Sequence, residues 1–278
     1  MKFGAHVSIS GGINKAPERA HALGCECFQI FTRSPRGGKP PALGKDLVDS
    51  FLTSCSSYGL PDYYIHTPYY INLASEKKEL RRSSVAIIRE ELERGSLIGA
   101  KYVMTHLGSS KGLGRAEAVD MVIEGIAEIL NGSGSLTTEL LLENTAGQGE
   151  TIGDTFEELA RILNETGDPR LGVCIDTAHL IASGYDIRTE ASLRHTLDAL
   201  YSVISPGRVK LLHGNDSKAG LGEKKDRHEH IGKGKIGQNG FKAILGNPAL
   251  EGLDMIVELP PEEVGEDIKL LKRMRTVI

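Results

Sequence analysis

Short β-rich runs alternate with longer helical patterns along the whole chain of 278 residues, and this alternation constrains the fold more than any other feature. Repeated β-then-α units predict a parallel sheet covered by helices. The strand candidates are residues 2–7, 27–31, 63–66, 102–106, 140–143, 171–176, 209–213 and 255–258. Eight such units predict an α/β fold, the (β/α)8 TIM barrel, in which about 250 residues commonly form one domain. We therefore expect residues 1–278 to form a single TIM-barrel domain.

The stretches between these runs carry apolar residues three and four positions apart, as amphipathic helices do. The clearest helix candidates are residues 76–98, 115–130, 155–164 and 188–203. The chain starts without the apolar stretch of a signal peptide and has no apolar run of about 18 residues, which predicts a cytoplasmic protein that does not enter a membrane. The cysteines have no CxxC spacing, so we expect buried thiols without function at Cys25, Cys27, Cys55 and Cys174.

Seven of the eight strand candidates run into a His, Asp or Glu at or next to their carboxyl ends. These runs read AHVS, YYIHTP, YVMTHLG, LLLENT, VCIDTAH, KLLHGND and IVELP. In an α/β barrel these ends converge on the face where active sites are built. A single histidine there is more often a hydrogen-bonded structural residue, but burying so many imidazoles and carboxylates together is costly without a compensating cation. The pattern therefore predicts bound metal ions. Of the nine histidines, only His21 and His195 fall in predicted helices.

Two short motifs have spacings suited to metal ligands. In Asp176-Thr177-Ala178-His179 the carboxylate ends a strand and the imidazole follows after the chain has left it. The alternative is an aspartate that only caps the next helix, but the nearby histidine and the other strand ends favour a ligand. In Asp226-Arg227-His228 the two-residue spacing points both side chains to one side of an extended segment, although an ordinary charged loop is an equally good interpretation. Imidazoles and carboxylates without thiolates fit zinc, manganese or iron at a site that is not purely structural.

The formal net charge of −4 gives no indication of nucleic-acid binding by itself. The distribution of charge is more informative, because residues 33–45 contain four basic and no acidic residues, and residues 218–235 contain six basic and three acidic residues. Both segments are predicted to be loops. They could be solvated surface or contacts for an anionic partner.

Taken in order, the motifs GAHVSISGG, YIHTPYYINLAS, THLGS, LLENTAGQG, CIDTAHLIASGYD, HGNDSK, DRHEHIGKGKIG and VELP resemble the endonuclease IV family of apurinic/apyrimidinic endonucleases. The resemblance extends from His6 to Glu258. It implies a TIM barrel that holds three zinc ions, with manganese as a partial substitute, and that acts as a monomer on double-stranded DNA. The implied reaction cuts the backbone 5′ to an abasic site and leaves a 3′-hydroxyl and a 5′-deoxyribose phosphate. Trimming of blocked 3′ ends is a further implied activity.

The resemblance also assigns residues. One ion would be held by His66, His106 and Glu143, a second by Glu143, Asp176, His213 and Glu258, and a third by His179, Asp226 and His228, with His6 beside the site. Glu143, Asp176 and Glu258 would be the catalytic carboxylates. Loops that enter the duplex would carry Arg36, Tyr69 and Tyr70, although adjacent tyrosines are also common in a packed rim. Family members often have an aromatic residue soon after the arginine, where this chain has Gly37-Gly38, and a small polar residue at the position of Glu223.

Two alternatives come from different classes of protein. A divalent-metal sugar isomerase or epimerase would share the barrel and the strand-end ligands, but it would not need the third ligand set of Asp226 and His228. A non-catalytic protein that recognises damaged DNA would use the metals only as structure. The basic loops and the Tyr69-Tyr70 pair favour DNA over a small sugar.

Overall fold

The computed structural model describes residues 1–277, and in them eight parallel strands close into a barrel in the order β1-β10-β7-β6-β5-β4-β3-β2. The barrel strands are β1 (Phe3–His6), β2 (Cys27–Ile30), β3 (Tyr63–His66), β4 (Tyr102–Thr105), β5 (Glu139–Glu143), β6 (Leu171–Asp176), β7 (Val209–His213) and β10 (Asp254–Val257). Each predicted strand is present with its ends shifted by one residue at most. The TIM-barrel prediction is confirmed.

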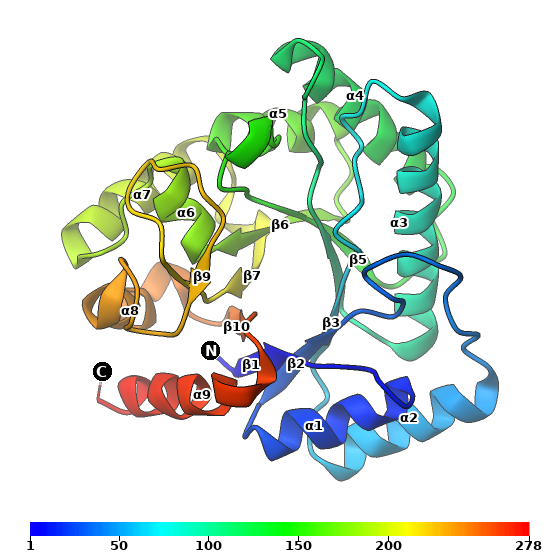
Figure 1. The fold of residues 1–278 in the computed structure, drawn as a ribbon, viewed down its shortest axis with the longest axis horizontal. Helices are drawn as coiled ribbons and strands as arrows, with labels where there is room; N and C mark the ends of the chain where they lie inside the picture. The colour runs from blue at the N-terminus through cyan, green and yellow to red at the C-terminus, as the bar shows by residue number, and fades with distance from the viewer. Residues whose placement is uncertain (278) are drawn as a thin grey trace.

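Helices surround the strands on the outside of the barrel (Figure 1). They are α1 (Ala16–Ala22), α2 (Lys45–Ser57), α3 (Lys78–Ile98), α4 (Arg115–Leu130), α5 (Phe156–Thr166), α6 (Thr177–Ser183), α7 (Glu190–Val203), α8 (Gly237–Gly246) and α9 (Pro261–Arg275). Local signals set several boundaries. The side chain of Thr155 accepts a hydrogen bond from the Glu158 backbone and caps α5. Gly99 ends α3 at a φ of 78°, a left-handed conformation that glycine adopts without strain.

Two apolar layers hold the barrel together. Inside it, one side chain from most strands forms a closed cluster of Cys27, Tyr64, Met104, Leu141, Cys174, Leu211 and Ile256. Outside it, the helices bury apolar stripes against the strands; in α4 the stripe is Val119, Val122, Ile126 and Ile129, at the helical spacing seen in the sequence. The interior cluster plugs the barrel and separates the polar groups at the carboxyl ends of the strands from those at the amino-terminal end.

The segment after β7 contains structure that the sequence patterns did not predict. A two-residue antiparallel ribbon pairs β8 (Asp216–Ser217) with β9 (His228–Glu229). The carboxylate of Asp216 accepts hydrogen bonds from the backbone of Gly232 at 2.9 Å and of Ile236 at 2.9 Å. This buried carboxylate therefore folds the basic loop back onto the barrel and fixes the start of α8.

One prediction about the histidines was wrong. His179 lies within α6, whereas the sequence pattern predicts helical positions for His21 and His195 alone. The helix has seven residues, Thr177–Ser183, which is too short to show an apolar periodicity of its own. It starts because Asp176 caps it directly at the end of β6.

All four cysteines are buried and free, as expected. Burial raises the pKa of the Cys174 thiol to about 12, so it is inert although it lies beneath the polar cluster. Among residues 1–277, no helix has the length and apolar character needed to cross a membrane.

Candidate metal centre

Histidines and carboxylates from the strand ends converge above the interior cluster. His66, Glu143, Asp176 and His213 are the last residues of β3, β5, β6 and β7, while His106 and Glu258 directly follow β4 and β10. Three groups have potential ligand atoms within 4.8 Å of one another: His66, His106 and Glu143; Glu143, Asp176, His213 and Glu258; and Asp176, His179 and His228. The barrel thus brings together residues up to 192 positions apart, from His66 to Glu258.

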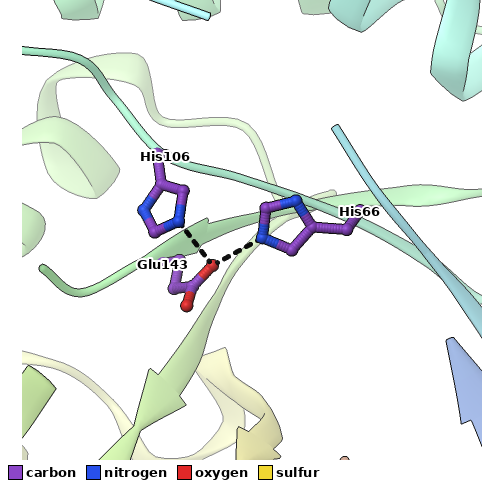
Figure 2. A group of neighbouring side chains, drawn as sticks. All are labelled: His66, His106 and Glu143. Carbon is purple, nitrogen blue, oxygen red and sulfur yellow. Dashed lines mark hydrogen bonds and ion pairs between the residues drawn. The ribbon is translucent and has the colours of Figure 1, made fainter. Parts of the chain in front are cut away.

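The two oxygens of Glu143 face different groups. Oε2 lies 3.0 Å from Nε2 of His66 and 3.6 Å from Nε2 of His106, and both imidazoles point at this oxygen in Figure 2. Oε1 lies 3.0 Å from Nδ1 of His213. Since Glu143 is fully buried, its carboxylate can serve two neighbouring ions from its two oxygens. This is the geometry that a bridging ligand requires.

Backbone carbonyls set the tautomers of two histidines. Nδ1 of His66 donates to the carbonyl of Thr67 at 2.6 Å, and Nδ1 of His179 donates to the carbonyl of Asn144 at 2.8 Å. Each bond fixes Nδ1 as the donor, so Nε2 is the nitrogen that faces the carboxylates and that offers a lone pair to a metal once its proton is lost. Metal-ligating histidines are typically fixed in this way through their second nitrogen.

Asp176 combines two roles that the sequence presented as alternatives. Its Oδ1 accepts from the backbone of His179 at 2.7 Å and caps α6. Its Oδ2 lies 3.7 Å from Nε2 of His228 and accepts from Nδ2 of Asn215 at 2.6 Å. The cap uses one oxygen, and the second oxygen remains in the cluster. The same hydrogen bond orients α6 so that His179 faces Asp176 and Asp226.

Gln29 is a polar residue of this cluster that the sequence patterns missed. It lies on β2, the one strand without a His, Asp or Glu at its end. Its Oε1 accepts from Nε2 of His213 at 2.9 Å, and its Nε2 donates to Glu258 at 2.6 Å and to Nδ1 of His6 at 3.0 Å. Gln29 therefore turns Nδ1 of His213 toward Glu143. An uncharged amide within the apolar run CFQIF was the only signal for it.

Two asparagines, also missed, support the carboxylates. Oδ1 of Asn215 accepts from the backbone of Glu258 at 2.8 Å, and Oδ1 of Asn144 accepts from the backbone of Asp176 at 2.6 Å. Both are buried. They cross-link the ends of neighbouring strands, so the carboxylates keep their positions without an ion pair to Lys or Arg.

His6 lies beside the cluster rather than within it. Its ring packs on Phe31 with centroids 4.3 Å apart, and its Nδ1 is 4.0 Å from Oε1 of Glu258. Burial lowers the pKa of His6 to about 3, so its imidazole is neutral and accepts from Gln29. Its position suits a supporting residue.

The pKa values show how strongly the charges are coupled. Burial opposes protonation of His179 and His228, yet the facing carboxylates of Asp176 and Asp226 raise the pKa of His179 to about 10 and that of His228 to about 9. Burial would raise the pKa of Glu143, but the imidazoles of His106 and His213 hold it well below its ordinary value. Glu143 therefore stays ionised at neutral pH although it is fully buried, which requires positive charge beside it.

A buried atom without a partner indicates what would supply that charge. Nε2 of His228 is buried and has no hydrogen-bond partner within residues 1–277, although Oδ1 of Asp226 is 3.3 Å away. The same Asp226 oxygen is 3.3 Å from Nε2 of His179. An ion placed among these three atoms would satisfy all of them, so the donor set fits a divalent metal.

The residues expected to touch DNA lie on loops around this cluster. Tyr69 is 69% exposed and packs edge-on against Phe31, with centroids 5.3 Å apart. A cavity of about 450 Å³ is lined by Tyr69, Tyr70, His106, His179 and Asp226 among others. Arg36 is exposed on the loop after β2 and does not join the cluster. Glu223 is also exposed.

Comparison with known proteins agrees with this arrangement. Residues 17–274 match the family described as Xylose isomerase-like TIM barrel. A protein of Methanoculleus marisnigri named Probable endonuclease 4 is 40% identical over 273 residues, which cover 98% of this chain and 97% of that protein. The chain belongs to the endonuclease IV family. The resemblance inferred from the sequence motifs is confirmed.

Solved structures extend the comparison. The crystal structure of endonuclease IV from Thermus thermophilus matches this chain with a TM-score of 0.89 and 37% identity, covering 100% of both chains. A D-tagatose 3-epimerase-like protein matches with a TM-score of 0.76 but only 18% identity, covering 100% of this chain and 98% of that one. The second match shows a shared barrel and nothing about chemistry.

Proposed function

We propose that this protein is a metal-dependent endonuclease of DNA base excision repair, which hydrolyses the phosphodiester bond 5′ to an apurinic or apyrimidinic site. The full-length relatives named endonuclease 4 and the match to a solved endonuclease IV support this function. So does the concentration of ligand-type residues at one end of the barrel. The products are a 3′-hydroxyl and a 5′-deoxyribose phosphate, and trimming of blocked 3′ ends belongs to the same proposal.

Two of the ligand sets follow groups in the cluster: His66, His106 and Glu143 would hold one ion, and Glu143, Asp176, His213 and Glu258 would hold a second. His179, Asp226 and His228 would hold a third; here the group found in the cluster has Asp176 with the two histidines, and Asp226 lies 3.3 Å from each of them. Zinc suits imidazole and carboxylate donors, and manganese could replace it in part. Three divalent ions would outweigh the four ligand carboxylates and leave a positive site in an acidic protein, which would attract a phosphate.

When bound, divalent ions activate water at neutral pH and neutralise the charge that develops on the attacking and leaving oxygens. The chain's own residues supply the geometry. Glu143 ties two ligand groups together through its two oxygens, and Asp176 ties the end of β6 to α6. The hydrogen bonds of Gln29 and Asn215 keep Glu258 and His213 in place. Such preorganisation lowers the cost of reaching the transition state.

Recognition of the lesion belongs to the loops. Tyr69 and Tyr70 line the cavity beside His106, and Arg36 projects from the neighbouring loop. Aromatic rings and a guanidinium plane can replace the stacking lost where a base is missing. We assign the protein a monomeric state because the ligand groups all come from one chain. A cytoplasmic location belongs to the same proposal, since the substrate is DNA.

The observation that carries the proposal is the split of the Glu143 carboxylate between two ligand groups in a chain of this family. The test is incubation of the metal-loaded protein with labelled duplexes that contain or lack one abasic site. We expect a single nick directly 5′ to the abasic site, read at nucleotide resolution on a gel, and no nick in the intact duplex. A chelator should abolish cleavage. Binding of the abasic duplex without any nick would indicate the non-catalytic alternative.

A further inference from the structure

The loop between β2 and α2 has little internal structure. None of residues 31–44, all of which the structure describes, lies in a helix or strand. Within it, the backbone of Arg36 donates to Oγ of Ser34 at 3.2 Å and the backbone of Gly37 donates to the carbonyl of Ser34 at 3.2 Å. Gly37 and Gly38 have φ angles of 104° and 98°, which side-chain-bearing residues rarely adopt. The tip is therefore held only by local bonds.

Both ends of this loop are attached to the same side chain. Arg94 of α3 donates from Nη2 to the carbonyl of Thr32 at 2.7 Å and from Nη1 to the carbonyl of Pro41 at 2.9 Å. Its Nε donates to Oγ1 of Thr32 at 2.6 Å. Arg94 is 6% exposed. One planar guanidinium thus closes a segment of ten residues into a loop with fixed ends.

Buried charges keep Arg94 in this position. Oγ1 of Thr32 donates to Oε2 of Glu91 at 2.6 Å, and Nε of Arg33 donates to Oε1 of the same carboxylate. Arg33 also donates to Glu90 at 2.7 Å. Glu91 is fully buried and one turn from Arg94 on α3. The base of the loop is therefore a satisfied network, and its donors and acceptors cannot easily rearrange.

The tip of the loop reaches the other DNA-facing loop. A Cβ placed on Gly37 would lie 4.0 Å from Cε1 of Tyr70, so the glycine backbone lies beside this ring. Gly37 and Gly38 have no side chain that could stiffen the tip. Besides the local bonds to Ser34, the fixed ends restrict the loop. Fixing them lowers the entropy that the loop loses when it binds a partner.

We propose that Arg94 is a positioning residue for Arg36: by tying Thr32 to Pro41 it holds the loop in the conformation that contacts abasic DNA. The inference rests on the proposed function for the role of the loop, and on the structure alone for the clamp. Arg94 faces neither the ligand cluster nor the cavity beside Tyr69. It therefore acts through the loop.

The test variant is Arg94→Lys, which keeps the charge and the aliphatic stem but cannot bridge two carbonyls as a guanidinium does. The matched control is Arg89→Lys on the same helix, where Nη2 donates to the carbonyl of Glu128 on α4 instead. Without DNA, we expect faster backbone hydrogen exchange of residues 33–41 in Arg94→Lys and unchanged exchange there in the control. Unchanged exchange in both variants would overturn the clamp.

Measuring DNA affinity and kcat separately distinguishes a role of Arg94 in positioning the loop from a general loss of stability. Arg94→Lys should weaken binding to an abasic duplex roughly tenfold, while kcat changes by less than about twofold and the metal content stays constant. Because Arg94 acts through Arg36, adding Arg94→Lys to Arg36→Ala should cost little more than Arg36→Ala alone. Losses that multiply in the double variant would overturn the proposal.

If Arg94→Lys does not fold, Thr32→Val removes one acceptor of the clamp without changing charge, and a smaller rise in exchange of the same loop is expected. An unchanged loop in Thr32→Val would overturn the clamp. Hydrogen exchange is measured without DNA, so it decides the clamp even if the wild-type protein fails to nick abasic duplex. That second failure would refute the proposed function alone.

Discussion

At the amino-terminal end of the barrel, Asp62 contacts the ammonium groups of Lys2 and Lys101, and Tyr64 donates to Oδ2 of Asp254 at 2.5 Å. At the carboxyl end, the carboxylates of the cluster have no such partners. Every ion pair that Glu143, Asp176, Asp226 and Glu258 make within residues 1–277 is with a histidine. The amino-terminal carboxylate is thus paired with permanent positive charges, whereas the carboxyl-end carboxylates face imidazoles, which can lose their protons.

The difference shows how one barrel separates stability from chemistry. Burial would raise the pKa of Asp62, but Lys101 and Lys2 hold it below its ordinary value, so the chain itself supplies the compensating charge. At the carboxyl end, the groups that face the carboxylates are imidazoles, which can be either charged or neutral. An imidazolium can release its proton to solvent when a metal ion binds its nitrogen near neutral pH, whereas lysine ammonium groups keep theirs. The carboxyl end is therefore the end that can exchange protons for metal.

Changing one carboxylate to an amide at each end should separate these roles most clearly. Glu143→Gln removes the charge shared by two ligand groups, so nicking of abasic duplex should fall by more than about 100-fold, beyond the usual effect of losing an outer hydrogen-bonding partner of a ligand. Far-ultraviolet circular dichroism should stay unchanged. The control is Asp62→Asn, which should nick normally. Near-normal nicking by Glu143→Gln would refute its assignment as a bridge.

The loops that carry Arg36, Tyr69 and Tyr70 follow the carboxyl ends of β2 and β3, and Tyr69 tests their role. Tyr69→Ala should weaken affinity for abasic duplex by roughly 5- to 150-fold, corresponding to about 1 to 3 kcal/mol of stacking. Metal content should not change, because the ring is 6.2 Å from that of His66 and supplies no ligand atom. Affinities for abasic and intact duplexes should be measured at one salt concentration. An equal loss for both would place lesion recognition elsewhere.

At the amino-terminal end the expected effect is on stability. Asp62→Asn should lower the free energy of unfolding by about 1 kcal/mol, a modest figure because the two lysine heads are about half exposed. The pKa of Asp62 is lowered by folding, so its contribution is present above its ordinary pKa of 3.8 and is lost as pH falls below that value. Denaturant unfolding at pH 7 and pH 3 measures this. If the difference in the free energy of unfolding between wild type and Asp62→Asn were the same at pH 3 as at pH 7, the ion-pair explanation would be contradicted.

The smallest expected effect is the release of protons from the histidines of the cluster when metal binds. In metal-free protein at pH 7.5, His179 and His228 hold protons, because their pKa values are raised to about 10 and about 9. Metal binding must displace these protons, so its apparent affinity should rise with pH across this range. Calorimetry of zinc binding in buffers of different ionisation enthalpy should show release of about two protons or more per chain. Binding without proton release would show that these imidazoles do not ligate.

The sequence was sufficient to predict the repeated strands and the ionisable residues at their ends. The eight strands were found because each is an apolar run with a regular place between helices, and the strand-end residues stood out because His66 or Glu143 is unusual in such a run. The predicted ligand sets remain proposals. Their side chains nevertheless lie together because parallel strands of a barrel share one carboxyl end.

Other parts of the site depend on contacts that no local pattern records. Gln29 and Asn215 are uncharged amides, and their importance comes only from partners far along the chain. The helix that holds His179 is too short for periodicity. The clamp of Arg94 on Thr32 joins residues 62 positions apart. Such contacts are set by packing, so they emerge only when the strands and helices are assembled.

Elemental analysis of the purified protein tests the central claim most directly, because divalent ions would replace the protons that the imidazoles at the carboxyl end hold in metal-free protein. We expect close to three divalent ions per chain, mostly zinc, and the same number in Asp62→Asn. In Glu143→Gln we expect a lower number. Fewer than one ion per chain in protein that nicks abasic duplex, or equal metal content in wild type and Glu143→Gln, would contradict this explanation.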